Sequence, residues 1–151
     1  MKKIIAGLLA VLLLAAVVTA CGADDERVTA VKNSYLRING APYGDYAQTI
    51  GEAFDSYFAG TRVNWSVSAE DGDSYTVTAV VTGNVSMDFE AYAQAVQFTR
   101  ISFEFRYDSA ADTVEYIGLE TTATHAGSAA EFSTNNGDMN LIWAIFGRPN
   151  V

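Results

Sequence analysis

The chain has few residues of three kinds on which many functions depend: cysteine, histidine and basic side chains. Its 151 residues include one cysteine and one histidine, and 9 basic residues stand against 18 acidic ones. Zinc sites need clusters of cysteine and histidine, and a hydrolytic triad needs a base to activate its nucleophile. The net charge of −9 argues against nucleic acid, which needs a basic stripe. We therefore expect no enzymatic activity, no cofactor, no metal and no nucleic-acid partner.

One long apolar run, Ile4–Val18, lies between Met1–Lys3 and Thr19–Cys21. A short basic region, an apolar core of this length and small residues at its end are typical of a secretory signal. A transmembrane helix is the alternative, since the stretch from Ile4 to Cys21 is just long enough to cross a bilayer. The acidic residues Asp24–Glu26 directly behind it favour cleavage. The sequence thus predicts a signal peptide over residues 1–20.

The end of the apolar run, Val18-Thr19-Ala20-Cys21, resembles the lipobox of bacterial lipoproteins. The resemblance implies transfer of a diacylglyceryl group to the Cys21 thiol and cleavage before Cys21; a buried cysteine in a membrane helix is the alternative. Because Gly22 is not an acidic retention signal, the resemblance implies the periplasmic face of the outer membrane in a two-membrane cell, and otherwise the outer face of the cell membrane. The mature domain would have no disulfide.

Cleavage would also remove Lys2 and Lys3, leaving 7 basic against 18 acidic residues and a net charge of −11. That charge argues against a domain lying on an anionic bilayer and favours one kept soluble beside it. An acidic docking face for a basic partner is the alternative. We expect residues 21–31 to be the lipidated cysteine and an acidic tether, and residues 32–151 to form a single globular domain.

The strongest helix signal begins at Thr49, where Thr49-Ile50-Gly51-Glu52 has the pattern of a capping box. Apolar residues then recur with helical spacing, and Gly60 is a stop signal. The residues of this apolar face are Ile50, Ala53, Phe54, Tyr57 and Phe58.

Two β-hairpins follow from strict alternation of apolar and polar residues. The first joins 62–69 to 75–82 through the turn Glu70–Asp73, and the second joins 101–107 to 113–122 through Asp108–Asp112. Between them, residues 86–97 fit either a short helix or an extended connection, and we favour the helix. The residues that fit its face are Phe89, Tyr92, Ala93 and Val96.

The chain after the second hairpin, His125–Gly137, is small and polar and predicts a loop. Asp138 then caps a short apolar helix that Gly147 and Pro149 end. Together these elements predict an α+β domain: one main helix packed on a four-stranded, mostly antiparallel sheet, with a short C-terminal helix. That helix would expose an apolar patch unless it packed on the sheet. Its apolar side carries Leu141, Ile142, Ile145 and Phe146.

The run from Tyr35-Leu36 through Thr49–Phe58 to Trp65 resembles a small, poorly characterised domain of bacterial envelope proteins. In that group a Thr-Ile-Gly-x-Ala-Phe-Asp helix precedes a strand that bears a tryptophan. The similarity covers roughly residues 34–120 and implies a fold and a location but no chemistry. The order of elements also resembles outer-membrane assembly lipoproteins and β-lactamase-inhibitor-like domains, in architecture only.

Few residues stand out as candidate site residues besides the lipidation site Cys21. Tyr35, Tyr43 and Tyr46 lack a clear inward period, so they are a possible interaction surface or a cover for the helix end. His125 is most simply a loop histidine, and Glu70–Asp73 a turn rather than a calcium site. We therefore expect a protein-interaction or scaffold module in the envelope, with a small-ligand-binding domain as the alternative.

Overall fold

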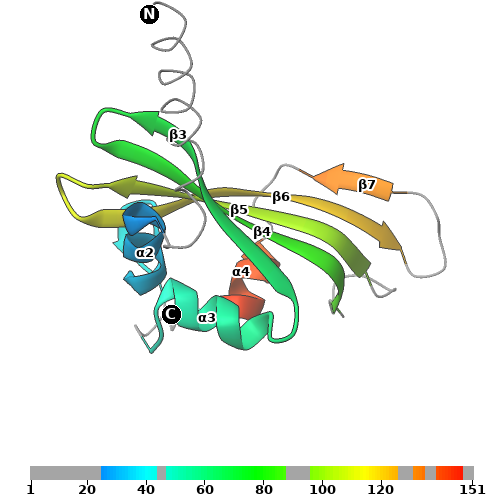
Figure 1. The fold of residues 1–151 in the computed structure, drawn as a ribbon. Helices are drawn as coiled ribbons and strands as arrows, with labels where there is room; N and C mark the ends of the chain where they lie inside the picture. The colour runs from blue at the N-terminus through cyan, green and yellow to red at the C-terminus, as the bar shows by residue number, and fades with distance from the viewer. Residues whose placement is uncertain (1–24, 44–46, 88–95, 126–130, 135–138, 148–151) are drawn as a thin grey trace, which may run out of the picture.

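Four long antiparallel strands form the body of the domain (Figure 1): β3 (Arg62–Asp71), β4 (Ser74–Met87), β5 (Val96–Asp108) and β6 (Thr113–His125). The structure is a computed structural model that describes residues 25–43, 47–87, 96–125, 131–134 and 139–147. Each strand pairs with the next one in the sequence. The predicted α+β fold is confirmed, and so are both hairpins, with Asp71 opposite Ser74 and Asp108 opposite Thr113.

A fifth, short strand corrects the prediction of a loop after the second hairpin. β7 (Glu131–Thr134) pairs with residues 121–124 of β6 and lies at the edge of the sheet. The sequence gives little sign of this strand, because a strand of four residues that pairs through backbone hydrogen bonds needs no long alternation of apolar and polar side chains. His125, predicted in that loop, is the last residue of β6, opposite Val96.

The region between the hairpins is extended wherever the structure describes it. β4 runs on to Met87 and β5 begins at Val96, so the predicted helix is wrong at both ends of residues 86–97. Val96, which we placed on a helical face, pairs with Met87. The other residues of that face, Phe89, Tyr92 and Ala93, lie outside the described residues.

The predicted main helix is α3 (Ile50–Tyr57), and its capping box is formed in full. The Thr49 N–H donates to Glu52 Oε2 at 2.8 Å, and the Glu52 N–H donates to Thr49 Oγ1 at 3.3 Å. Ile50, Ala53 and Phe54 are buried against the sheet. Gly60 follows with a φ of +80°, which suits a glycine at a helix end.

Replacing Thr49 by alanine removes one half of this capping box. We expect the free energy of unfolding to fall by about 1 kcal/mol, the usual cost of losing such a cap. Urea denaturation followed by circular dichroism measures it. Ser56→Ala, on the exposed side of the same helix, is the control, and its free energy of unfolding should not fall. Equal stability of the Thr49 variant and this control would show that the box contributes nothing.

The segment expected to be a tether is largely a helix, α2 (Glu26–Asn33), which Asp25 caps by accepting the Arg27 N–H at 2.9 Å. Val28 and Val31, three residues apart, point to one side and are buried, with only 3% and 0% of their surfaces exposed. α2 contacts β3, β4 and β5, so residues 26–31, expected in the tether, are packed on the sheet. Residues 21–24 of the predicted tether lie outside the described residues.

The start of α2 is held by a bidentate ion pair within one turn of chain. The Arg27 guanidinium donates to Asp25 Oδ1 at 2.8 Å and to Oδ2 at 2.7 Å. Its third nitrogen donates to Glu70 at 3.1 Å, and its carbon lies 4.9 Å from the centre of the Tyr75 ring. This arginine therefore joins α2 to the β3–β4 turn.

The same pair makes stability depend on pH in the acid range. The hydrogen bond from the Arg27 side chain lowers the pKa of Asp25. A lowered folded-state pKa adds stability that is complete above the unfolded value of about 4 and is lost as pH falls through the folded value. Asp25→Asn keeps a capping side chain, so we expect it to flatten the loss of stability below about pH 4. Melting curves from pH 2 to 7 test this, and Asp55→Asn, an exposed aspartate on α3, should leave the acid limb unchanged.

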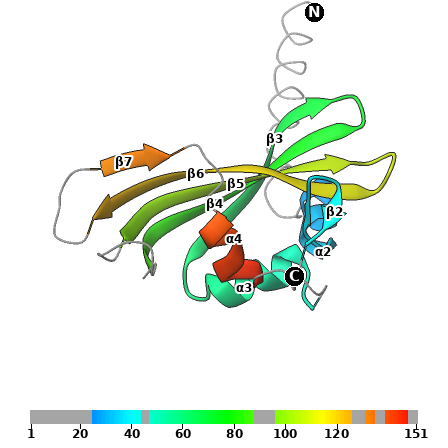
Figure 2. The ribbon, with the colours of Figure 1, turned by 180° about the vertical axis from the view of Figure 1, so that it is seen from behind.

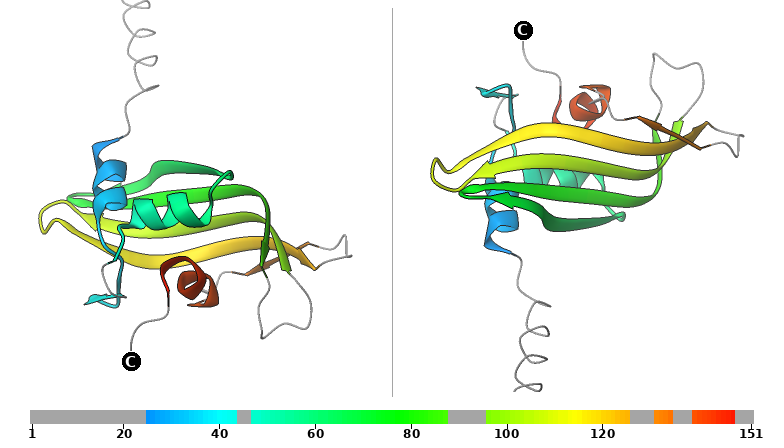
Figure 3. Two further views of the ribbon diagram at one scale, coloured as in Figure 1. Left: turned by 90° about the horizontal axis from the view of Figure 1, so that it is seen from below. Right: turned by 90° about the horizontal axis from the view of Figure 1, so that it is seen from above.

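The three helices of the described residues, α2, α3 and α4 (Met139–Phe146), lie on one face of the sheet (Figures 1 and 2). Seen from below, the helices lie in front of the strands; seen from above, the strands lie in front (Figure 3). α4 packs on the sheet as predicted and buries Leu141, Ile142 and Ile145. Its predicted cap, Asp138, and Pro149 lie outside the described residues. None of the described helices is long and apolar enough to cross a membrane.

Phe54 is the centre of the core between these helices and the sheet. Its side chain has no exposed surface, and its ring centre lies 4.9–6.1 Å from those of five other aromatic rings. These rings come from the C-cap of α3, from two strands of the sheet, β3 and β5, and from α4, so one side chain joins both layers. They are Phe58, Trp65, Phe103, Phe105 and Phe146.

Candidate functional site

Two of the three tyrosines predicted as a possible interaction surface, Tyr35 and Tyr43, differ in burial. Tyr35 is 44% exposed. Tyr43 is partly buried against the core, which raises its pKa, and its hydroxyl donates to the Gly147 carbonyl at 3.2 Å. Tyr43 therefore fastens the chain before α3 to the end of α4, while Tyr35 stays at the surface. Tyr46 and the lipidation candidate Cys21 lie outside the described residues.

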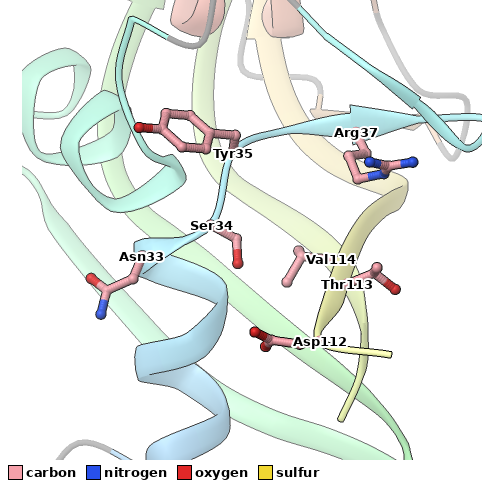
Figure 4. A pocket seen from close by; sticks show the side chains of 7 residues that line it. All are labelled: Asn33, Ser34, Tyr35, Arg37, Asp112, Thr113 and Val114. Carbon is pink, nitrogen blue, oxygen red and sulfur yellow. The ribbon is translucent and has the colours of Figure 1, made fainter. Parts of the chain in front are cut away.

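Beside Tyr35 the surface forms an open hollow of about 290 Å³ (Figure 4). Three segments meet there: the end of α2, the strand β1 (Arg37–Ile38) that follows it, and, distant in the sequence, the β5–β6 turn with the start of β6. Three polar side chains, two side chains of opposite charge, one aromatic ring and one valine therefore share a small area. The lining residues are Asn33, Ser34, Tyr35, Arg37, Asp112, Thr113 and Val114.

The first wall of the hollow is fixed by hydrogen bonds at the end of α2. The Ser34 N–H donates to the Val31 carbonyl at 3.1 Å, and the Ser34 hydroxyl donates to the Ala30 carbonyl at 2.8 Å. The Ser34 carbonyl accepts the Ile50 N–H at 2.8 Å, which ties the same residue to the first turn of α3. Tyr35 follows Ser34 directly in the sequence, so α2 and α3 together fix its position.

The second wall is a small hairpin of β1 and β2 (Ala41–Pro42). Asn39 and Gly40 form its two-residue turn with φ of +52° and +74°, the conformation that an Asn-Gly pair favours. The Gly40 N–H donates to Glu115 Oε1 at 2.8 Å, which docks the hairpin on β6, and the Arg37 guanidinium donates to the Gly40 carbonyl. Arg37 is thus held beside the hollow.

The third wall is the tight β5–β6 turn. Asp108 Oδ1 accepts the N–H groups of Ala110 and Ala111 at 3.0 and 2.9 Å. Asp112 has a φ of +49° and accepts the Tyr107 hydroxyl at 3.4 Å. Burial and the Asp112 carboxylate raise the pKa of Tyr107. Asp112 and Arg37 thus lie on different sides of the hollow, with Thr113 and Val114 between them (Figure 4), and hydrogen bonds hold all of its walls.

The lining of this hollow is mostly polar and charged. Its lining offers a guanidinium, a carboxylate, an amide, hydroxyls and one exposed phenol ring, and it has neither an imidazole nor a thiol. Within the described parts of the chain, no three metal-ligating side chains gather at one place. The acidic run Glu70–Asp73 forms a hairpin turn, as predicted, and Glu70 pairs with Arg27 there.

Sequence analysis found one residue of this hollow, Tyr35, and missed the others. The hairpin pair Asn39-Gly40 is a strong local signal that went unused. The Asp108–Asp112 turn was predicted, but nothing in its sequence connects it with the end of α2. No protein-family model matches the chain, and no match is found among curated proteins or among solved structures.

Proposed function

We propose that this protein is a lipid-anchored interaction module of the cell envelope that holds another envelope protein at the hollow beside Tyr35. The observation that carries the proposal is the pairing of an exposed tyrosine, 44% accessible, with Arg37 and Asp112 around one open hollow. Tyrosine and arginine are the residue types enriched at protein interfaces and at their energetic centres. The lipobox resemblance at Cys21 supports the anchor and the location at the membrane.

The hollow is suited to a protein partner because it is already ordered. Main-chain hydrogen bonds hold Ser34 and Gly40 on two of its walls, so binding need not pay for ordering a loop. The Tyr35 ring offers rigid apolar area at its rim. Arg37 and Asp112 offer opposite charges, which select a partner side chain or chain end that carries polar groups.

The proposal is tested in cells with the full-length, lipidated protein. A photo-crosslinking amino acid at position 35 should capture one envelope protein. The same amino acid at Tyr57, which is 36% exposed on α3, is the matched control and should not capture it. Arg37→Glu should weaken the crosslink at position 35, and Cys21→Ala should abolish it. Equal crosslinking at both positions, or a crosslink that Arg37→Glu leaves unchanged, would exclude the hollow as the contact surface.

A second candidate function, binding of a small polar ligand, is favoured by the size of the same hollow. Its volume of about 290 Å³ is near the lower end of small-molecule sites. A ligand at a hundred times its dissociation constant would stabilise the domain by about 2.7 kcal/mol. Thermal-shift measurements with envelope metabolites and peptidoglycan fragments test it, with Asp112→Asn as the variant that should reduce the shift. An unchanged melting temperature throughout would count against this function.

A further inference from the structure

The two edges of the sheet are protected to different degrees. At one edge, β7 covers residues 121–124 of β6, and the β1–β2 hairpin docks beside Glu115. At the other edge, β3 pairs with β4 and with no other strand of the described chain. Alternate residues of β3 therefore present backbone N–H and C=O groups away from the sheet, as in any edge strand.

The middle of β3 itself carries none of the residues that usually guard an edge strand, and a charge beside it comes from α2, whose Lys32 ammonium lies 5.6 Å from the centre of the Trp65 ring. Between Val63 and Val67 there is no charged residue and no proline. The register shift that marks a β-bulge comes only after Val67. Val63, Trp65 and Val67 are merely half-buried, although the equivalent residues of β4 are fully buried. This stretch thus combines free backbone groups with apolar side chains that one more strand would cover.

The pattern of this edge is symmetric about Trp65. Val63 and Val67 lie two residues to either side, and the polar residues Asn64 and Ser66 lie between them. In an antiparallel pair of two identical strands centred on Trp65, valine meets valine, tryptophan meets tryptophan, and Asn64 meets Ser66. A two-fold interface requires this kind of self-complementarity.

Charge also favours the antiparallel arrangement. The acidic turn of the hairpin, Glu70–Asp73, lies at one end of β3, and Arg62 lies at the other. An antiparallel pair places the acidic turn of each copy at the end where its partner carries Arg62. A parallel pair would set the two acidic turns side by side, where like charges repel.

We propose that two copies of this chain pair through β3, antiparallel and centred on Trp65, so that their sheets become one continuous sheet. The two-fold axis is then perpendicular to the sheet, and the helices of both copies lie on the same face. Val63, Trp65 and Val67 of each copy are covered by their counterparts, which extends the aromatic core across the interface. This dimer uses a surface separate from the hollow beside Tyr35, so each can exist without the other.

Register-specific disulfide formation in cells tests the dimer on the full-length chain. Chains with Asn64→Cys and chains with Ser66→Cys are expressed separately and together and are then oxidised with copper phenanthroline. Together they should give on the order of tenfold more disulfide dimer than either alone, because like positions lie about 7–8 Å apart diagonally, too far to bridge. The unsubstituted chain gives the background, and Thr82→Cys, exposed on β4, should add nothing to it.

A charge at the edge supplies the second measurement. Ser66→Lys, placed in the Asn64→Cys chain, should remove its crosslink to the Ser66→Cys chain while the domain stays folded by circular dichroism, whereas Thr82→Lys in the same chain should leave the crosslink in place. Equal crosslinking in all pairs, or none, overturns the dimer. A photo-crosslinker at Trp65 that captures a different envelope protein overturns it as well. Photo-crosslinking from position 35 of the Ser66→Lys chain tests the proposed function independently of the dimer: capture of a partner protein supports that function, and no capture contradicts it.

Discussion

Replacing Phe54 by alanine is expected to destabilise the domain by about 3–5 kcal/mol, the usual range for a large side chain removed from a core. The loss is large because the ring is fully buried and lies within 6.1 Å of five other rings, which cannot all move to fill the cavity. Since a domain of this size is held by about 5–15 kcal/mol, much of its stability would be lost.

Urea denaturation of the variant and of the unsubstituted protein measures this change in the free energy of unfolding. The change is calculated from the shift in the urea midpoint when the slope of the transition is the same for both proteins. Tyr35→Ala is the matched control, since it also removes an aromatic ring but from an exposed position. It should change stability by less than about 0.5 kcal/mol. A Phe54 variant that unfolds at the same urea concentration as this control would show that Phe54 is not the centre of the core.

Val31→Asp is expected to unfold the domain or to destabilise it by several kcal/mol, because it places an unpaired charge at a site with no exposed surface. The same substitution at Thr29, on the exposed side of α2, should be tolerated. Amide hydrogen exchange of α3 and β3 measures the stability of both variants. If the Val31 variant is as stable as the Thr29 variant, α2 is a tether, and the packing of Val31 contributes nothing to stability.

The elements that the sequence predicts well are those whose signal is local. Apolar and polar residues alternate along β3, as at Val63, Trp65 and Val67, and a period of two residues fits a β-strand with one buried face. The capping box at Thr49 is likewise contained in four consecutive residues. Both hairpins and α3 therefore follow from the sequence alone.

Elements that depend on distant contacts escape prediction. α2 carries only two buried apolar residues in eight, Val28 and Val31, and its acidic start resembles a tether. β7 forms because its backbone groups pair with those of β6, and no pattern within Glu131–Thr134 predicts that pairing. The hollow beside Tyr35 joins three segments, so its composition is visible only once they have met.

Gly51 illustrates a signal that is visible in the sequence and yet cannot be interpreted there. A glycine inside a helix costs about 1 kcal/mol relative to alanine. In the structure, a Cβ atom at this position would lie 3.0 Å from the Lys32 carbonyl oxygen and 3.1 Å from the Lys32 Cβ. The glycine therefore lets the end of α2 approach the first turn of α3, which sets the junction at Ser34.

The order of the strands has a consequence for how fast the chain folds. Each strand from β3 to β7 pairs with the strand that follows it in the sequence, so the sheet closes only short loops. Short sequence separation between contacting residues is the feature that speeds folding among small domains. The hairpins can form early, before α2 and α4 dock on the sheet. If the chain is exported and anchored as proposed, it would spend little time at the membrane surface with its apolar strands uncovered.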